Sequence, residues 1–382
     1  MRNKYLLTLG TAHIFTDMNS GALPAMLPFL IAAGGLKYAE AAGLTFAVAI
    51  SSTLTQPVFG FIADKMSKVW FWPFGVLLAG GGLSLIGFFP NHYWIMFIAA
   101  MICGIGIAAF HPEGARIANR MAGKKKGSGM SLFTVGGNIG IGVGPLIVTP
   151  ALVYLGLKGS FVLAIPAITM CVVLFFLYPK MRSFAEDSEK KMEKPAGELK
   201  NEWLKFLWLS IAIISRSIIA HGFNIFLPLY WVNDLYQSKA TSGLLITVMT
   251  FVGAVVTIVG GRLADRYGMN TIIKIGWIIL IPATFFLTSI TNPVLLILML
   301  VPIAIGNFLV NTPLIVLGQQ YLPKNVGFAS GITLGLGVSI GGVVAPLLGR
   351  YADIYGLTST IKLLTLLPLL GIVVAFTSKP PR

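Results

Sequence analysis

Charged residues are scarce in this sequence. Only 11% of its 382 residues are Asp, Glu, Lys or Arg, whereas 56% are hydrophobic. Soluble domains carry about 25% charged residues, so the composition excludes an ordinary soluble protein and is typical of an integral membrane protein. Cysteine is rare as well. Cys103 and Cys171 both fall in apolar segments, so we expect neither a disulfide framework nor a metal site built on them.

The sequence also lacks the motifs of several enzyme and pump classes. It contains no G-x-x-x-x-G-K-[ST] nucleotide loop, which excludes the usual ATP-driven pumps. No serine or cysteine nucleophile with a base and no set of metal ligands is apparent, so we expect neither an enzyme nor a bound cofactor. The net charge of +15 does not indicate nucleic-acid binding, because the cations cluster in loops on one side of the apolar segments.

Apolar segments of about 20 residues recur along the whole chain, the length needed to cross a hydrocarbon core of about 30 Å. They lack the alternation of barrel strands, which favours helices. The first segment continues past Asp17 without a cleavage site, so we interpret it as a helix rather than a signal peptide. The predicted fold class is an all-α membrane protein. Its twelve transmembrane helices are placed at 5–32, 40–63, 70–89, 93–118, 128–155, 159–178, 203–233, 239–263, 271–290, 293–320, 326–350 and 358–377.

The cations predict the orientation. With both termini in the cytoplasm, all but six of the 28 Lys and Arg fall in cytoplasmic segments. Arg216 lies inside a helix, and the other five lie on the outer side: Lys37, Lys158, Lys239, Arg350 and Lys362. This asymmetry agrees with the positive-inside rule and predicts that both termini are cytoplasmic.

The chain divides into two halves that repeat each other. The polar stretch Lys180–Lys205 has mixed charge and predicts a cytoplasmic linker. We therefore expect an N-terminal six-helix half at 1–179, a linker at 180–202 and a C-terminal six-helix half at 203–382. At an offset of 200–201 positions, Leu27-Pro28 recurs as Leu227-Pro228, and GFIADK recurs as GRLADR. Two pseudo-symmetric halves around a central site predict a transporter that works by alternating access.

The repeated loop sequences carry a family resemblance. GFIADKMSK (60–68) and GGRLADRYG (260–268) resemble the loop between helices 2 and 3 of the major facilitator superfamily, which recurs between helices 8 and 9. The resemblance implies the major facilitator fold and a latch that holds one conformation. The first copy ends in Met66-Ser67-Lys68, where the family more often has a glycine. A generic turn with solvated charge is the alternative. The predicted gating residues are Gly60, Asp64 and Lys65 in the first copy and Gly261, Asp265 and Arg266 in the second.

A glycine-rich stretch lies in the fifth predicted helix. GGNIGIGVGPL (136–146) resembles the helix 5 motif of the superfamily's drug/proton antiporters. Spaced glycines let two helices approach closely, and a proline can bend the helix. The motif favours an exporter, although the related copy at 337–346 shows that packing alone can yield such a pattern. The predicted helix-packing residues are Gly136, Gly140, Gly144 and Pro145.

Three stretches of the first half point to one branch of the superfamily. HIFTDMNSGALPAMLPFL (13–30), FHPEGARIA (110–118) and SLFTVGGNIGIGVGP (131–145) resemble the fosmidomycin-resistance branch. The resemblance implies a multi-pass protein of the bacterial inner membrane that exports fosmidomycin-like phosphonates or related antimicrobials by proton-coupled antiport. The expected partners are a small-molecule substrate and the lipid bilayer, with protons as coupling ions, no nucleic acid and a monomeric state.

Ionisable residues inside the first-half helices are candidates for proton coupling, because charge in a bilayer costs at least ~2.5 kcal/mol per group and usually serves a function. Asp17 lies near mid-membrane, one turn after His13. With His111 and Glu113 it forms the proposed proton-coupling set. The alternatives are a permanent ion pair or a hydrogen-bonded carboxylate at Asp17, and a static pair between Glu113 and Arg116, which are three positions apart.

The second half contributes a buried cation. Arg216 occupies nearly the depth of Asp17 in the repeat, and a guanidinium binds phosphonate or carboxylate oxygens in a bidentate manner. If these two residues face one cavity, they could pair when the cavity is empty, and substrate and proton would then compete. A purely structural pair is the alternative. The predicted substrate-binding residues are Arg216, His221, Asn138, Asn224, Asn311 and Trp231.

Two other functions stay open from the sequence. A proton-coupled importer of an organic anion or nutrient differs from the exporter by direction, which no single residue encodes. A membrane enzyme or channel is a more distant alternative. A channel would not need a two-half repeat with a latch sequence in each half.

Overall fold

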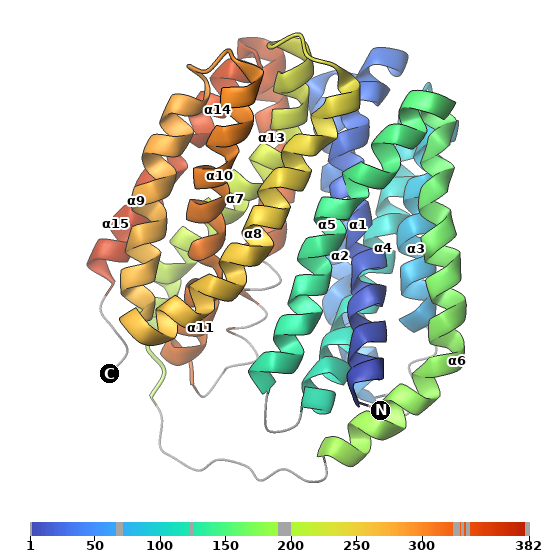
Figure 1. The fold of residues 1–382 in the computed structure, drawn as a ribbon, viewed down its shortest axis with the longest axis vertical. Helices are drawn as coiled ribbons and strands as arrows, with labels where there is room; N and C mark the ends of the chain where they lie inside the picture. The colour runs from blue at the N-terminus through green and yellow to red at the C-terminus, as the bar shows by residue number, and fades with distance from the viewer. Residues whose placement is uncertain are drawn as a thin grey trace. The chain divides into compact units, whose positions relative to one another are not determined.

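The computed structural model describes residues 2–65, 72–122, 126–189, 200–323, 329, 332–333 and 337–378. Within these ranges the regular secondary structure is helical throughout, as predicted. The chain divides into two compact units, each built of long, roughly parallel helices (Figure 1). Unit 1 comprises Met1–Leu36 and Gly43–Pro195, and unit 2 comprises Lys37–Ala42 and Ala196–Arg382.

Six α-helices and two short 3-10 helices make up the first part of the chain. They are α1 (Arg2–Gly34), α2 (Tyr38–Lys65), α3 (Trp72–Leu85), η1 (Ile86–Phe88), α4 (Tyr93–Ala122), α5 (Lys126–Leu155), η2 (Leu157–Leu163) and α6 (Ala164–Glu189). Helix α6 continues past its predicted end at 178 as far as Glu189, so the beginning of the predicted linker is helical. Alanine and glutamate favour helix without needing apolar surroundings, which explains this extension.

The second part of the chain holds the remaining helices. They are α7 (Trp203–Asn233), α8 (Lys239–Tyr267), α9 (Met269–Leu287), α10 (Pro293–Leu309), α11 (Asn311–Tyr321), α13 (Gly337–Tyr355), α14 (Leu357–Leu364) and α15 (Leu367–Thr377). Most of the predicted helix segment 326–336 lies outside the described residues.

Two predicted helices are each divided in the structure. The predicted helix 293–320 is split at Val310 into α10 and α11, and the predicted helix 358–377 is split at Thr365–Leu366 into α14 and α15. A proline follows each break, Pro313 in α11 and Pro368 in α15. Proline has no backbone N–H and cannot donate to the carbonyl four residues earlier, so the ladder is interrupted there. Taking each divided pair as one span, the twelve predicted helices are all present.

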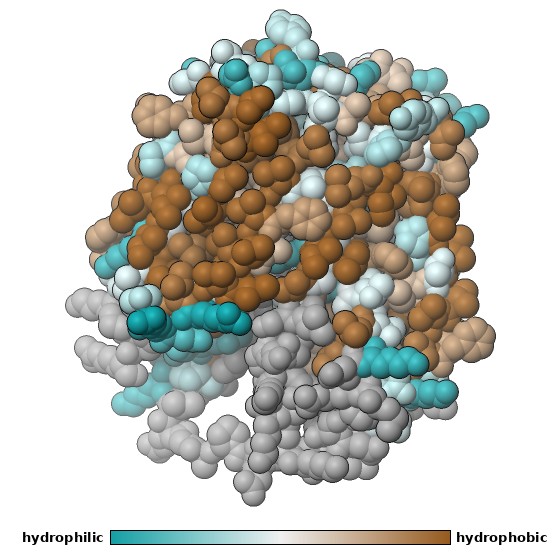
Figure 2. All heavy atoms as spheres, viewed as in Figure 1, coloured by the Kyte–Doolittle hydropathy of each residue, from teal (hydrophilic) through white to brown (hydrophobic). Residues whose placement is uncertain are grey.

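The helices carry a surface suited to lipid. Within the described ranges, nine helical segments are long and apolar enough to cross a membrane, and Trp72–Phe88 is a shorter apolar one. Large hydrophobic side chains stay exposed along them, including Phe176 at 70% and Phe285 at 64%. In Figure 2, hydrophobic residues cover the helix faces seen from this side and hydrophilic residues gather near helix ends. Such a surface needs no cover in a bilayer, so the chain is a multi-pass membrane protein.

Helices α1 and α5 pack backbone to backbone through glycines. A Cβ atom at Gly136 would lie 2.6 Å from the carbonyl oxygen of Gly10, and one at Gly140 would lie 2.5 Å from that of Ile14. A Cβ atom at Gly144 would lie even closer to the carbonyl oxygen of Met18. Because these glycines recur every four residues, they lie along one face of α5. This stripe lets α5 approach α1 closely enough to bring polar groups of the two helices together.

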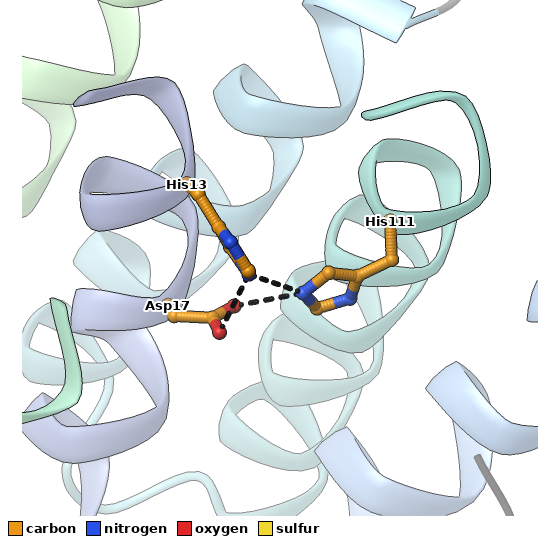
Figure 3. Close-up of side chains that lie close together, drawn as sticks. All are labelled: His13, Asp17 and His111. Atoms are coloured by element: carbon orange, nitrogen blue, oxygen red, sulfur yellow. Dashed lines mark hydrogen bonds and ion pairs between the residues drawn. The ribbon is translucent and has the colours of Figure 1, made fainter. Parts of the chain in front are cut away.

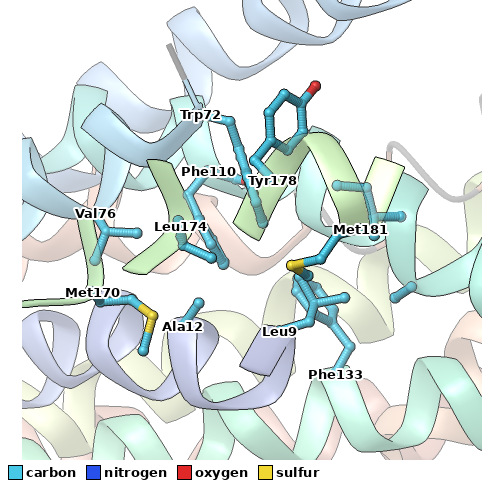
Figure 4. Close-up of a cluster of buried hydrophobic side chains, with 12 residues drawn as sticks. Leu9, Ala12, Trp72, Val76, Phe110, Phe133, Met170, Leu174, Tyr178 and Met181 are labelled. Atoms are coloured by element: carbon cyan, nitrogen blue, oxygen red, sulfur yellow. The ribbon is translucent and has the colours of Figure 1, made fainter. Parts of the chain in front are cut away.

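An apolar cluster in unit 1 holds α1, α3, α4, α5 and α6 together (Figure 4). The rings of Trp72 and Phe110 stack at 5.5 Å between centroids. The indole Nε1 of Trp72 donates a hydrogen bond to the carbonyl oxygen of Phe110 at 3.0 Å. Phe133 and Tyr178 belong to the same cluster. It therefore fixes the part of α4 that carries His111.

We expect Gly144→Ala to destabilise the protein and Gly81→Ala to leave it stable. Both changes gain up to about 1 kcal/mol of helix propensity. The methyl group at position 144 would overlap the carbonyl oxygen of Met18, whereas position 81 has nothing within 4 Å. Overpacking costs roughly 1–3 kcal/mol, so the Gly144→Ala protein should unfold at a lower temperature, as followed by circular dichroism in detergent. Equal melting temperatures would contradict the packing described for α1 and α5.

Candidate functional site

Three ionisable side chains converge inside unit 1, two from α1 and one from α4 (Figure 3). The Nε2 atom of His13 lies 3.0 Å from Oδ2 of Asp17 and 3.0 Å from Nε2 of His111. The same nitrogen of His111 lies 3.1 Å from Oδ1 of Asp17. The side chains of His13 and Asp17 are 6% and 14% exposed, and that of His111 is 23% exposed. We call these three residues the His–Asp–His cluster.

The ring of His13 is fixed by helix α5. Its Nδ1 lies 2.6 Å from the backbone oxygen of Phe133, and the two rings stack at 3.9 Å between centroids. A carbonyl oxygen only accepts hydrogen bonds, so Nδ1 carries the proton that it donates. In a neutral imidazole the other nitrogen is then an acceptor. In its neutral form His13 therefore presents a lone pair at Nε2 to the carboxylate of Asp17, and in its protonated form the same nitrogen donates a hydrogen bond to that carboxylate.

The hydrogen bonds within the cluster cannot all form at once. Each imidazole Nε2 has either one N–H or one lone pair in the plane of its ring, so it makes one good hydrogen bond. Each of the two nitrogens, however, has two close neighbours in the cluster. The Oδ1 atom of Asp17 is buried, and its close partner is Nε2 of His111 at 3.1 Å. When both imidazoles are neutral, the cluster therefore has more close contacts than hydrogen atoms to satisfy them, around one negative charge.

This donor set can hold a positive charge. Two imidazole nitrogens and a carboxylate are ligands for a proton or for a transition-metal ion. In the described part of the chain, this is the one group of three or more His, Cys, Asp or Glu whose ligating atoms lie within 4.8 Å of one another. His13 lies outside the proton-coupling set predicted from the sequence. Its position one helical turn before Asp17 is the sequence signal that indicates its part in the cluster.

Helix α5 leaves room for the cluster by having a glycine beside it. A Cβ atom at Gly137 would lie 2.7 Å from Oδ2 of Asp17 and 2.8 Å from Nε2 of His13. Any side chain there would press on both groups. Gly137 follows Gly136, the first glycine of the packing stripe, so close helix approach and site formation are linked. Gly137 is not among the residues predicted from the sequence.

A second polar group lies further along α4. Glu113 is 1% exposed, and its Oε2 accepts a hydrogen bond of 2.6 Å from Nε of Arg116. Its Oε1 accepts one of 2.9 Å from the hydroxyl of Tyr178 on α6. The predicted contact between Glu113 and Arg116 is thus present. Tyr178 is an additional partner that spacing along one helix could not reveal, because it is 65 positions away.

Arg216 lies buried in α7, at 7% exposure. Within the described ranges it makes no hydrogen bond or ion pair. The nearby His221 donates from Nδ1 to the backbone oxygen of Ser217 at 3.1 Å, which leaves its Nε2 as an acceptor. A buried guanidinium without a partner is costly. This arrangement is therefore suited to an anion that reaches Arg216.

The other predicted substrate-binding residues are spread over both units. Asn138 on α5 belongs to unit 1, and Asn224 on α7 and Asn311 at the start of α11 belong to unit 2; all three are half-buried. Trp231 is buried, and its Nε1 donates to Oγ1 of Thr241 at 2.9 Å. Asp17 has its close partners within unit 1. The suggested pair between Asp17 and Arg216 therefore stays a prediction.

The second predicted gating loop lies within the described residues, whereas only part of the first does. Gly60 lies near α4, because a Cβ atom there would be 3.9 Å from Cβ of Pro112. The side chains of Asp64 and Lys65 lie outside the described residues. In the second copy, Gly261 has open space beside it, and Asp265 and Arg266 are exposed near the end of α8. Their role as a latch stays a prediction.

Comparisons with known proteins agree with this architecture. A family model described as Major Facilitator Superfamily matches residues 9–346. The uncharacterized MFS-type transporter YfnC of Bacillus subtilis is 29% identical, and the fosmidomycin resistance protein of Escherichia coli is 26% identical. Each alignment covers 96% of this chain and 91% of the relative.

Solved structures show the same fold. A bacterial homologue of the human lysosomal transporter Spinster, in an inward-facing and occupied conformation, superposes with a TM-score of 0.78. The two sequences are 14% identical, and the superposition covers 99% of this chain and 96% of the other. The twelve-helix fold and the match over residues 9–346 lead to one conclusion: the chain belongs to the Major Facilitator Superfamily of membrane transporters.

Proposed function

We propose that the protein is an antiporter of the bacterial inner membrane, with both termini in the cytoplasm. It exports fosmidomycin-like phosphonates or related anionic antimicrobials as protons enter. The observation that carries the proposal is the separation of two kinds of buried charge. A cluster that binds positive charge lies in unit 1, and a guanidinium without a partner in the described ranges lies in unit 2.

Arg216 supports an anionic substrate. Its guanidinium keeps its charge at any physiological pH, so in an apolar surrounding it needs a counter-ion. A phosphonate or carboxylate group fits, because its oxygens accept two parallel hydrogen bonds from one guanidinium. The acceptor Nε2 of His221, one turn further along α7, can receive a hydrogen bond from a hydroxyl of the substrate. The fosmidomycin resistance protein, at 26% identity, supports a phosphonate as the substrate class.

The His–Asp–His cluster supports proton coupling. An added proton lets an imidazole donate to Asp17, which removes the contact between a lone pair and a carboxylate. Releasing the proton restores that unfavourable contact, so the cluster has a reason to change its contacts with each proton that it takes up or releases. Each charge that moves through the membrane potential provides ~2.3 kcal/mol per 100 mV. This energy can drive export without nucleotide hydrolysis.

Arg216→Gln should reduce phosphonate transport roughly 10- to 100-fold in kcat/KM. Hydrogen bonds to charged groups contribute about 1.5–3 kcal/mol, which converts to this range. Uptake of labelled fosmidomycin into inside-out vesicles measures the effect. Arg216→Lys keeps the charge but loses the bidentate geometry, so its kcat/KM should lie between those of the native and Arg216→Gln proteins. The control is Arg350→Gln, which removes an exposed cation. Normal transport by both Arg216 variants would rule out this anion site.

Asp17→Asn should abolish uphill export but retain exchange of labelled for unlabelled substrate. Asparagine keeps the shape and loses the negative charge that holds the proton, whereas exchange needs no net proton movement. Proteoliposomes with and without a proton gradient separate the two activities. Glu40→Gln is the control, because Glu40 accepts a hydrogen bond from the backbone of Lys37 outside the cluster. Gradient-driven transport at the native rate in Asp17→Asn would contradict the coupling role.

Glu113→Gln distinguishes the two interpretations of Glu113. If Glu113 mainly neutralises Arg116, the variant should lose stability, by up to roughly 3–5 kcal/mol for a fully buried pair, because the partly buried Arg116 loses the carboxylate that neutralises it. The double variant Glu113→Gln with Arg116→Gln should recover part of this loss. If Glu113 carries a proton, the single variant should instead lose gradient-driven transport at unchanged melting temperature. Melting and transport assays on the same preparations decide between the two results.

A further inference from the structure

We propose that the His–Asp–His cluster is also a binding site for a divalent transition-metal ion of the zinc class. The ligands would be Nε2 of His13, Nε2 of His111 and the carboxylate of Asp17. The two Nε2 atoms lie 3.0 Å apart, Nε2 of His13 lies 3.0 Å from Oδ2 of Asp17, and Nε2 of His111 lies 3.1 Å from Oδ1 of Asp17. Zinc ligands lie about 2.0–2.1 Å from a tetrahedral ion, and such ligands are about 3.3 Å apart. Movements of a few tenths of an ångström would therefore admit the ion.

An ion at the centre satisfies contacts that hydrogen atoms cannot. Two imidazole nitrogens with one in-plane position each cannot serve all the close contacts of the cluster by hydrogen bonding. A single cation accepts the lone pairs of all three groups at once. The buried Oδ1 of Asp17, whose close contact is Nε2 of His111 at 3.1 Å, can coordinate the same ion. The arrangement is thus better suited to one central cation than to hydrogen bonds alone.

The surroundings of His13 are those of a metal ligand. Metal-binding histidines usually donate their second ring N–H to a carbonyl or carboxylate, which fixes the tautomer and the ring orientation. His13 does so through Nδ1 to the backbone oxygen of Phe133 at 2.6 Å, and the ring of Phe133 stacks against it. When the ring is neutral, its Nε2 therefore directs a lone pair at the cluster.

The ligand set selects the class of ion. Two imidazoles and one carboxylate suit Zn²⁺, Cu²⁺, Ni²⁺ or Fe²⁺, whereas Mg²⁺ and Ca²⁺ prefer oxygen ligands throughout. Three protein ligands leave a fourth position for water or a substrate oxygen. Gly137 borders the site without filling it. Because the same three side chains are proposed to hold the coupling proton, we expect zinc to inhibit transport, a consequence that rests on the proposed function.

Direct binding to the full-length protein tests the site without any transport assay. The protein is purified in detergent with a tag that contains no histidine and is treated with a chelator. Co²⁺ is then added, and its visible absorption reports a low-symmetry nitrogen and oxygen site. We expect one equivalent of Co²⁺ to bind and Zn²⁺ to displace it. Zinc affinity follows from competition with a fluorescent chelator.

Three variants locate the ion. His111→Asn removes one ligand and should weaken zinc binding at least about 100-fold, since even loss of a supporting contact costs 10- to 100-fold. Gly137→Ala keeps every ligand but places a methyl group against Asp17 and His13, and should also weaken binding. His92→Asn removes an exposed histidine outside the cluster and should bind as the native protein does. Native affinity in the His111→Asn protein would overturn the proposal.

X-ray absorption of the zinc-loaded native protein keeps the test decisive if a variant fails to fold. Two imidazoles should appear in the first coordination shell, together with oxygen ligands. A shell without imidazole, or a native protein that binds neither Co²⁺ nor Zn²⁺, would refute the site. A protein that binds zinc but does not couple transport to protons would contradict only the proposed function.

Discussion

Two imidazole nitrogens and the two carboxylate oxygens of Asp17 form three contacts of 3.0–3.1 Å inside an apolar bundle, and the packing of the surrounding helices in unit 1 holds these groups together. Their close contacts cannot all be satisfied by hydrogen bonds, so the surrounding helices must hold them in place. The glycine stripe of α5 brings Phe133 against α1, and its carbonyl oxygen orients His13. The aromatic cluster around Trp72 and Phe110 fixes the turn of α4 that precedes His111. Tight packing here brings together the three side chains that we propose bind a cation.

In the proposed exchange of an anion for protons, each unit supplies one of the two binding sites. Unit 1 contributes a cluster that attracts positive charge, and unit 2 contributes Arg216, which attracts negative charge. A transporter that exchanges an anion for protons needs a site for each charge, in apolar surroundings where an unpaired charge is unfavourable. The pair of Glu113 and Arg116 differs in kind, because both of its charges are neutralised locally and Tyr178 adds a further hydrogen bond. Its geometry is that of a clamp between α4 and α6.

Much of the fold could be predicted from the sequence, because a run of about 20 apolar residues in a membrane satisfies its backbone hydrogen bonds by forming a helix. The division of the predicted helix 293–320 at Val310 could not be predicted. Pro112 and Pro313 occupy matching positions in the repeat, yet α4 continues through Pro112 whereas a break precedes Pro313. Proline permits a break, and the surrounding packing decides whether one forms. For the same reason Asp17 and His111 were found as isolated ionisable residues, whereas the part of His13 depends on contacts 98 and 120 positions away.

We propose that the His–Asp–His cluster couples proton movement to substrate movement. The most direct measurement follows the internal pH of proteoliposomes with a trapped dye as phosphonate is added. The native protein should move protons when substrate is present, and the His13→Gln protein should move substrate down its gradient without moving protons. Equal proton movement per substrate in the native and His13→Gln proteins would contradict the account.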